Sequence, residues 1–556
     1  MNHLNILTRR APSRCNRIIA SRSIRTRHSE VMDPHFADAE LSRNPFYNYT
    51  SGRWLWDEKS QLHKRHQPFN VDRLKEVAAT CANANTCVSM TKLPEGSFNK
   101  AFLLTMDNGA QVVARIPNPY LPPKVATGSE VATLDFLRNE LNIPVPQVLA
   151  WSSEKDQPVG AEYIIMEKAP GQELSKIWPS MDVSDKVDIV SQLVNIQAKI
   201  CSVDFKYYGS LYYRGQASGH HDIPGIPSRF CIGPSSALRF WEAERRTCNK
   251  YKGPWSSPIS YAEDVAKREI NWISQFATPR DVSDPLRQST SQESPRCHLQ
   301  LLDKYLKVIS QVVPSDHDVY RSTIWHSDLH FGNIFVEKNQ IVSIIDWQGC
   351  TALPLFLTCK IPKFLRLNGP LLFDLPPAAG LTAQEKKETL FRYQLTQLQS
   401  FYCSKFRDLD NGIFRAMSDE HAMTRQQLVD FAGSTWEDDG LLFFRETLRQ
   451  VLADWNEIAN GTDSNCPITL SSNELSSHAA ERKVWDEYKA LFDSLGIPID
   501  GWVHLEDFES AADTMRKLVT EIIATAENQE AARRAMRAWK LTDQKSTVLS
   551  SRAMDI

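Results

Sequence analysis

The chain has 556 residues, a hydrophobic fraction of 42% and a formal net charge of −3. This length permits two or three domains with a sizeable core. The nearly balanced charge argues against a general nucleic-acid binder. No run of about eighteen apolar residues occurs, so we predict no transmembrane helix.

Residues 1–29 have a composition of their own. They hold no acidic residue before Glu30, and several are serines or threonines. Their positive charge comes from arginine, at Arg9, Arg10, Arg14, Arg17, Arg22, Arg25 and Arg27. A cationic leader without acids is typical of a mitochondrial transit peptide. We therefore predict a transit peptide over residues 1–29 and a mitochondrial location, with an unstructured basic arm as the alternative.

Residues 30–69 are predicted to be a lead-in segment to the first domain. Large aromatic side chains recur in it, at Phe46, Tyr47, Tyr49, Trp54 and Trp56. They follow no clear period, so we expect an irregular segment whose rings pack on the domain that follows. A helix is expected next, over residues 72–84, because Leu74, Val77 and Ala78 fall on one face.

A β-meander is predicted after this helix, within a first domain that spans residues 70–168. Its strands are expected over residues 88–93, 100–106 and 111–116, and Asn108-Gly109 joins the last two. Asn-Gly between apolar strands is a strong hairpin signal, because both residues tolerate a positive φ. Gly96 and Ser97 lie between the first two strands, where backbone amides could cover the phosphates of a nucleotide. An ordinary strand turn would explain Gly96 equally well.

A cation and an acid follow the meander. Arg115 ends the third strand, and Glu130 is predicted to open a helix that Ser129 could cap. In kinases a strand cation grips the phosphates and pairs with a helix glutamate. We expect Arg115 and Glu130 to form that pair, with an ordinary surface ion pair as the alternative. Arginine makes a planar, bidentate contact where lysine supplies a point charge, so an arginine in place of the lysine changes the geometry of the contact.

A hinge is predicted where the first domain ends. Strands are expected over residues 147–151 and 161–166, and the residues from Glu167 to Gly171 then break the pattern. Such a break between two lobes leaves backbone groups free to read the edge of an adenine. We therefore place the nucleotide in the cleft beside Glu167.

Helical sequence dominates residues 169–500, which are predicted to form the second lobe. Helices are expected over residues 182–200, 299–313, 384–406, 425–432, 442–455 and 479–495. Irregular or loop-like structure is expected for residues 206–232, 278–295 and 459–477. Residues 501–556 are predicted to form a C-terminal helix and tail, with the helix over residues 507–539. Glu437, Asp438 and Asp439 could bind a cationic substrate, although a solvated acidic run is the ordinary explanation.

The segment from His326 to Gly349 carries the densest chemistry. Two short apolar strands, residues 334–336 and 341–345, are joined by a polar turn. Asp328 and Asn333 precede the first strand, and Asp346 follows the second, so their side chains are expected to meet at one end of a hairpin. Phosphoryl transfer needs a carboxylate to accept a proton, and an amide oxygen and a second carboxylate to hold magnesium. Asp328, Asn333 and Asp346 have the spacing of such a catalytic loop.

These motifs together resemble the aminoglycoside phosphotransferase and choline kinase-like family. The likeness is carried by Gly96-Ser-Phe-Asn, Arg115, Glu130, His326-Ser-Asp328 with Asn333, and Ile345-Asp346-Trp347. The segment from Tyr49 to Leu55 and the basic leader are similar to the fungal mitochondrial branch, the group of altered inheritance of mitochondria protein nine.

The resemblance implies an α+β, two-lobed, protein-kinase-like fold with a small antiparallel β N-lobe and a larger, mostly helical C-lobe. It implies ATP and Mg²⁺ as cofactors. Asp328 would be the catalytic base and His326 would brace its loop, while Asn333 and Asp346 would hold the metal. The α- and β-phosphates would be oriented by Arg115 with Glu130.

The implied function is transfer of the γ-phosphate to a hydroxyl of a small-molecule acceptor in mitochondria. The alternative is a non-catalytic, nucleotide-binding scaffold with a role in mitochondrial maintenance. A kinase acting on proteins is a third interpretation. It is disfavoured because no Ala-Pro-Glu element follows Asp346 to bind a substrate along an activation segment.

Overall fold

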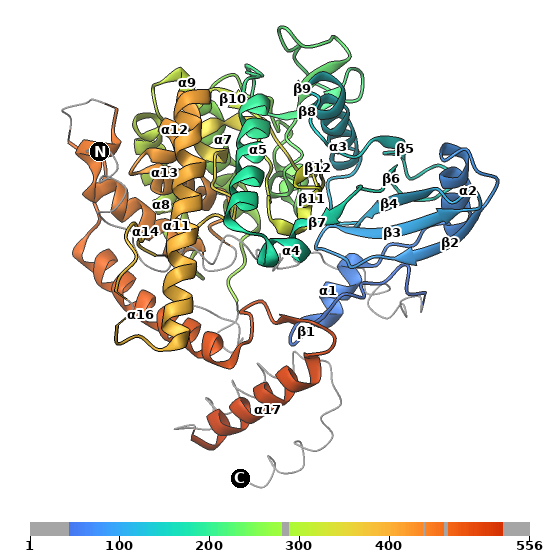
Figure 1. Cartoon of the computed structure of the whole chain (residues 1–556). Helices are drawn as coiled ribbons and strands as arrows, with labels where there is room; N and C mark the ends of the chain where they lie inside the picture. Colours follow the sequence, from blue (N-terminus) through green and yellow to red (C-terminus); the bar gives the residue numbers. More distant parts are fainter. Residues whose placement is uncertain are drawn as a thin grey trace.

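The fold is described by a computed structural model over residues 44–280, 289–367, 369–377, 379–436, 440–460 and 465–525. The predicted transit peptide, the start of the lead-in segment and the acidic run at 437–439 lie outside these residues. The part of the predicted 507–539 helix that follows residue 525, and the C-terminal tail, also lie outside them. A small sheet-containing lobe adjoins a larger helical lobe, as Figure 1 shows. The predicted α+β, two-lobed architecture is therefore confirmed.

The small lobe is built on an antiparallel five-stranded sheet in the order β2-β3-β4-β6-β5. Its strands are β2 (Cys87–Lys92), β3 (Asn99–Met106), β4 (Gln111–Pro117), β5 (Val148–Ser152) and β6 (Tyr163–Glu167). Alternate side chains of β3 and β4 are buried, and those of Phe102 and Ala114 belong to a core beneath α2 (Val71–Cys81). The predicted Asn108-Gly109 turn joins these two strands, and Gly109 has the positive φ of +81° that the turn requires.

The helix that carries Glu130 begins earlier than predicted. Helix α3 (Val125–Asp135) starts just after Pro122 and Pro123, so Glu130 lies in its middle and Ser129 is not a cap. Its first turn is held instead by Glu162, whose carboxylate accepts hydrogen bonds from the Lys124 amide (3.0 Å) and the Thr127 hydroxyl (2.7 Å). Glu130 therefore lies on a buried interior turn of the helix.

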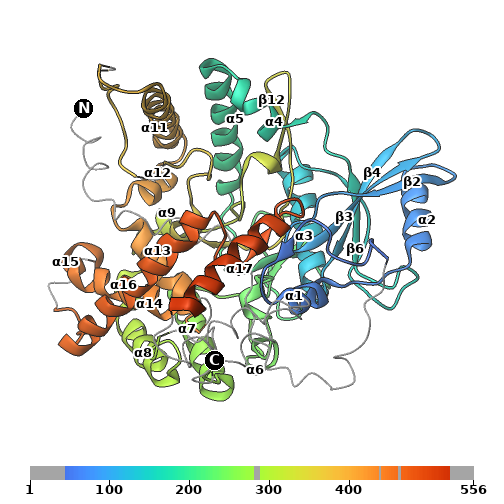
Figure 2. The same cartoon turned by 90° about the horizontal axis from the view of Figure 1, so that it is seen from below.

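The lead-in segment packs on the small lobe, as predicted, and also on the C-terminal element. Phe46 contacts Phe102 with ring centroids 5.5 Å apart. The segment contains α1 (Glu58–Arg65) and β1 (Arg53–Trp54), and β1 pairs with β14 (Trp502–Val503), which precedes α17 (Phe508–Thr525). Seen from below, α17 crosses the lower face between α1 and the helices of the large lobe (Figure 2).

The chain crosses from the small to the large lobe at the predicted hinge. After β6 ends at Glu167, Gly171 adopts a φ of +78°, and β7 (Gln172–Glu173) pairs with β11 (Ile334–Glu337). A Cβ on Gly171 would lie 2.7 Å from the Val336 carbonyl oxygen. Both the conformation and the close approach require glycine, and they anchor the hinge to the segment that carries Asn333.

The large lobe is mostly helical. Its helices are α4 (Leu174–Ile177), α5 (Val183–Cys201), α6 (Arg245–Cys248), α7 (Pro258–Phe276), α8 (Pro295–Val312), α9 (His317–Tyr320), α10 (Leu355–Thr358), α11 (Ala383–Leu409), α12 (Asn411–Ser418), α13 (Ala422–Ala432), α14 (Gly440–Ala453), α15 (Trp455–Ile458) and α16 (Ser472–Leu495). Short antiparallel pairs join β8 (Ser210–Tyr213) to β9 (Phe230–Gly233) and β10 (Ser322–Thr323) to β13 (Leu353–Pro354). No described helix combines the length and apolar character needed to cross a bilayer.

Some segments predicted as irregular are ordered. Residues 206–232 contain β8 and the start of β9, and the predicted loop at 459–477 gives way to α16 at Ser472. That helix starts with a capping box in which Ser471 and Glu474 satisfy each other's backbone amides. In the polar stretch 278–295, Gln292 is buried and bonds the carbonyls of Thr435 and Trp436, so this end is not at the surface.

Candidate active site

A hairpin positions the predicted catalytic segment. Strand β11 pairs with β12 (Gln340–Ile344), and the turn between them uses positive φ angles at Lys338 and Asn339, as in the mirror-image turns that match strand twist. At the other end, the amide of Ile345 donates to the Asn333 carbonyl over 2.9 Å. Asp346 follows with a φ of +67°. The sequence thus brings Asn333 and Asp346 to the same end of the hairpin, as predicted.

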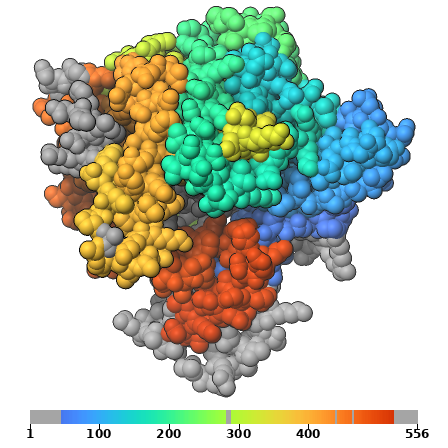
Figure 3. Space-filling view, viewed as in Figure 1, coloured from blue at the N-terminus to red at the C-terminus, as the bar shows by residue number. Residues whose placement is uncertain are grey.

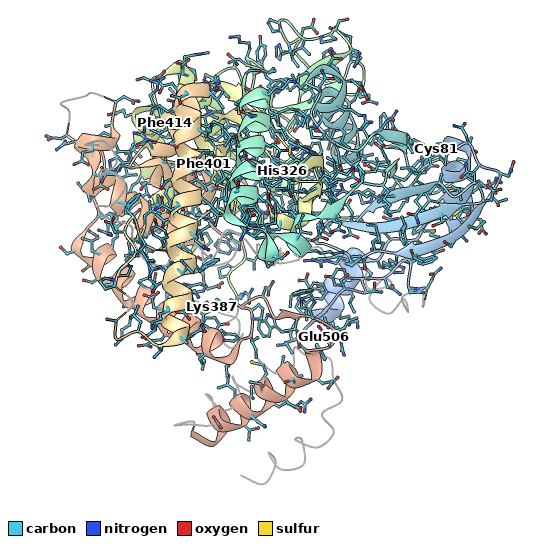
Figure 4. All side chains as sticks on the ribbon, viewed as in Figure 1. Cys81, His326, Lys387, Phe401, Phe414 and Glu506 are labelled. Carbon is cyan, nitrogen blue, oxygen red and sulfur yellow. The ribbon has the colours of Figure 1, made fainter. Side chains whose placement is uncertain are left out.

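His326 is buried behind this end of the hairpin. Its Nε2 donates to the Ile345 carbonyl over 2.9 Å, and its Nδ1 accepts the Asp328 amide over 3.2 Å. Because Nδ1 accepts, the ring is neutral, and burial lowers its pKa from the ordinary value of 6.5. The imidazole also packs edge-on against Trp347. Figure 4 labels His326 in the interior of the molecule. Through these two hydrogen bonds, His326 connects the Asp328 loop to the strand that leads to Asp346.

Asn333 orients the same loop. Its amide nitrogen donates to the Asp328 carbonyl over 2.9 Å, and the residue is 6% exposed. That bond fixes which way the side-chain amide points, so its oxygen is the atom left to face a ligand. Carboxylate and amide oxygens are hard donors of the kind magnesium prefers.

The Asp328 carboxylate lies partly open to solvent and contacts a cation. Nζ of Lys363 lies 2.5 Å from its Oδ1. Lys363 precedes Phe364, whose ring stacks on Phe331 of the catalytic loop with centroids 4.6 Å apart. The aromatic contact holds the backbone that presents the lysine. Sequence reasoning missed Lys363, because nothing in its local pattern separates it from a surface lysine.

Arg115 bridges the two lobes. Its guanidinium bonds the Glu130 carboxylate of α3 and donates to Asp346 Oδ1 over 2.8 Å. The predicted Arg115–Glu130 pair therefore forms, and the Glu130 side chain is 2% exposed, which excludes an ordinary surface pair. A second cross-lobe bond runs from Asn99 to the Gln348 side chain over 2.8 Å.

Burial sets the charge balance of this cluster. Desolvation raises the pKa of Glu130 to about 7, against the opposing attraction of Arg115. Desolvation also opposes the charge on Arg115, but Glu130 and Asp346 together raise its pKa above the ordinary value. Arg115 is thus charged at any physiological pH, whereas Glu130 titrates within that range.

The other predicted nucleotide contacts lie at the edges of the small lobe. Gly96 and Ser97 are exposed in the loop before β3, and Gly96 has room for a Cβ, so this loop does not require glycine for steric reasons. Glu167 lies at the hinge, where its carboxylate accepts the Gln147 amide over 3.1 Å and lies 3.2 Å from Arg138. The Glu167 carboxylate thus contacts neighbouring residues of the hinge, Gln147 and Arg138.

Comparison with known proteins matches the sequence of this chain to one family. The model of the phosphotransferase enzyme family matches residues 89–356, a range that contains each predicted site residue from Gly96 to Asp346. A subtelomeric hrmA-associated cluster protein of Aspergillus fumigatus is 31% identical over 507 residues, which cover 82% of this chain and 97% of that protein. The Candida tropicalis protein named altered inheritance of mitochondria protein 9, mitochondrial, is 24% identical over 567 residues, with 89% of each chain covered.

Among solved structures, a thermostable mutant of aminoglycoside phosphotransferase APH(4)-Ia in ternary complex with AMP-PNP and hygromycin B is similar, with a TM-score of 0.36 and 13% identity. The match covers 70% of this chain and 99% of that chain. The family assignment comes from the sequence matches, since the 31% identity extends over nearly the full length of the Aspergillus protein and the family model spans both lobes. The chain belongs to the phosphotransferase enzyme family.

Proposed function

We propose that this protein transfers the γ-phosphate of ATP to a hydroxyl of a small molecule in mitochondria. The observation that carries the proposal is the contact of Arg115 with both Glu130 and Asp346. It joins a phosphate-orienting cation, its helix partner and a metal-binding acid in one connected group, which phosphoryl transfer requires.

Asp328 would act on the acceptor. Lys363 engages one carboxylate oxygen, Oδ1, which leaves Oδ2 to accept the proton of the acceptor hydroxyl. As that proton leaves, the acceptor oxygen bonds to the γ-phosphorus, the bond to the bridging oxygen of ADP breaks, and ADP departs.

Asn333 and Asp346 would hold Mg²⁺. The donor set fits: Arg115 occupies Oδ1 of Asp346 and leaves the second carboxylate oxygen, and the Asn333 amide nitrogen is already used by the Asp328 carbonyl. When bound, the metal would neutralise phosphate charge. The chain's own part is to hold these two residues at the same end of one hairpin.

The remaining predicted residues would bind ATP. Arg115, held by Glu130, would orient the α- and β-phosphates, and the backbone of Gly96 and Ser97 would cover them. Glu167 would mark the adenine end of the cleft, where the hinge backbone offers hydrogen-bonding groups. The AMP-PNP in the APH(4)-Ia complex belongs to that protein, and ATP use here is part of the proposal.

The mitochondrial location rests on two independent supports. Residues 1–29 have the composition of a transit peptide. The Candida relative carries the word mitochondrial in its name.

Turnover by purified protein tests the proposal. With Mg²⁺ and radiolabelled ATP, wild type should transfer label to at least one member of a panel of hydroxylated metabolites. Asp328→Ala should lower kcat by at least about a hundredfold, the lower end of the contribution of a positioned general base. Asp188→Ala, which changes an exposed acid on α5, serves as the matched control and should keep wild-type turnover.

Equal and slow ATP turnover by wild type and Asp328→Ala across the panel would contradict the catalytic role. If magnesium-ATP still stabilised both proteins against heat, the non-catalytic scaffold would be the better account. Label appearing in mitochondrial protein bands instead of metabolites would favour a protein kinase.

A further inference from the structure

A buried carboxylate links the lead-in segment to the loop that contains Gly96 and Ser97. The Glu95 side chain is 1% exposed. Its Oε2 accepts the Thr50 amide over 2.7 Å and the Thr50 hydroxyl over 3.1 Å. The backbone amide of Glu95 in turn donates to the Ser51 hydroxyl over 2.6 Å. Two consecutive lead-in residues thus hold both the side chain and the backbone of the residue before Gly96.

Two lysines compensate the buried charge of Glu95. Nζ of Lys92 lies 2.8 Å from Oε2, and Nζ of the fully buried Lys100 lies 3.8 Å from Oε1. Lys100 also donates to the Arg65 carbonyl of the lead-in segment and to the Asn118 side chain. Burial lowers the pKa of Lys100 to about 8, with Glu95 opposing that shift. Such groups stay ionised inside a protein only with partners of this kind.

The network continues to the tip of the loop. Asn118 donates through its amide nitrogen to the Ser97 carbonyl over 3.0 Å, and the Tyr120 hydroxyl bonds the same oxygen. The Ser97 carbonyl therefore points away from any ligand on the other side of the loop. Exposed loop residues that are fixed through their backbone lose little entropy when a ligand binds.

The lead-in residues on either side of Thr50 and Ser51, which are Tyr49 and Gly52, contact the C-terminal element. Gly52 packs against Trp502 so closely that a Cβ would lie 2.5 Å from the indole nitrogen. That nitrogen donates to the Tyr49 hydroxyl over 3.1 Å. Figure 3 shows the C-terminal segment, in red, below the two lobes and beside the blue N-terminal part.

We propose that Thr50 and Ser51 are positioning residues that fix the Gly96-Ser97 loop for ATP. They act through Glu95, and their neighbours Tyr49 and Gly52 contact Trp502, so the lead-in and C-terminal elements set nucleotide affinity from outside the catalytic motifs. The inference rests on the proposed function, because the loop must cover the phosphates for its order to influence binding.

Calorimetry with Mg²⁺ and AMP-PNP on the full chain tests the inference without an acceptor. Ser51→Ala removes the acceptor for the Glu95 amide, and Thr50→Val removes a hydroxyl at nearly constant shape. The double variant should raise the Kd for AMP-PNP about tenfold, the loss expected for a hydrogen bond to a charged group. Ser51→Thr with Thr50 unchanged keeps both hydroxyls and should bind AMP-PNP with nearly wild-type affinity. Each variant's Tm is measured beside its Kd.

Ser60→Ala is the matched control. Its hydroxyl lies on α1 of the same segment and makes no hydrogen bond among the described residues, so its Kd should equal that of wild type. Wild-type affinity in the double variant would overturn the inference while leaving the proposed function intact. A Kd raised equally by Ser51→Thr would also overturn it. No binding by wild type would refute the proposed function itself, and the inference with it.

If the double variant fails to fold, Thr50→Val alone decides the matter, because Glu95 then keeps its bond from the Thr50 amide. A Kd raised severalfold with an unchanged Tm would support the positioning role. An unchanged Kd would contradict it.

Discussion

The contacts of Arg115 explain why an arginine, and not a lysine, suits this position. A guanidinium presents several donors in a fixed plane, so it can bond the Glu130 and Asp346 carboxylates together. A lysine in this position would offer a compact charge on a flexible stem and a weaker geometric constraint. The arginine therefore fixes Asp346 relative to α3 before any nucleotide binds.

The titration of Glu130 gives a pH prediction. Its pKa is raised from 4.5 to about 7, so the folded state binds this proton more tightly than the unfolded state does. The resulting stabilisation is present below pH 4.5 and is lost as pH rises through 7. Relative to Glu130→Gln, wild type should lose up to about 3 kcal/mol of unfolding free energy across this window.

Urea unfolding of wild type and Glu130→Gln at matched pH values measures that difference. If the difference in unfolding free energy between wild type and Glu130→Gln stayed constant across pH, the raised pKa of Glu130 would be refuted. Asp135→Asn, which changes a partly exposed acid on the same helix, is the control for the loss of a carboxylate from α3.

At the level of elements, the hinge glycine couples the lobes. Gly171 needs a positive φ and lies against the Val336 backbone, so the crossing segment and β11 are held in contact. Gly171→Ala should lower the free energy of unfolding by about 2 kcal/mol, through left-handed strain and the close approach. It should also reduce turnover, because β11 leads directly from Asn333.

Thermal unfolding and turnover of Gly171→Ala check this expectation. Gly160→Ala is a suitable control, since Gly160 also has a positive φ of +74° but has open space for a Cβ. A loss of stability no larger than that of Gly160→Ala would show that contact with β11 is unimportant.

At the level of the whole molecule, the two ends of the described chain support the small lobe together. Leu55 of the lead-in segment shares a hydrophobic cluster with Val503 and Phe508, and Figure 4 labels Glu506 near this junction. The N-terminal residues before this unit are predicted to serve a different purpose, which is delivery to mitochondria.

Removing residues 1–29 should leave the protein in the cytosol, because a cationic leader without acids is the signal that the import machinery reads. Fractionation of cells expressing full-length and truncated forms measures the location. Replacing the seven arginines of residues 1–29 with glutamine is the matched test of charge. Import that is unchanged in both forms would refute the transit-peptide assignment.

Local patterns predicted the strands of the small lobe and the hairpin of the catalytic segment, whereas they misplaced the starts of some helices. The hairpin between Asn333 and Asp346 followed from two apolar runs and a polar turn. The predicted start of α3 was wrong because Ser129 resembles a helix cap. The actual first turn is bound by Glu162, which is remote in sequence. The predicted start of α16 at residue 479 was too late, although Ser471 and Glu474 have the spacing of a capping box.

The sequence by itself determined the family, the two-lobed architecture and the placing of Asn333 and Asp346 at one end of a hairpin, because hairpin geometry is local and its period is short. Only the tertiary structure decided that Lys363 contacts Asp328, and that Thr50 and Ser51 hold Glu95. These contacts join residues far apart in the chain, and burial gives them their strength. The local sequence pattern does not show which remote residues will bury a charged group.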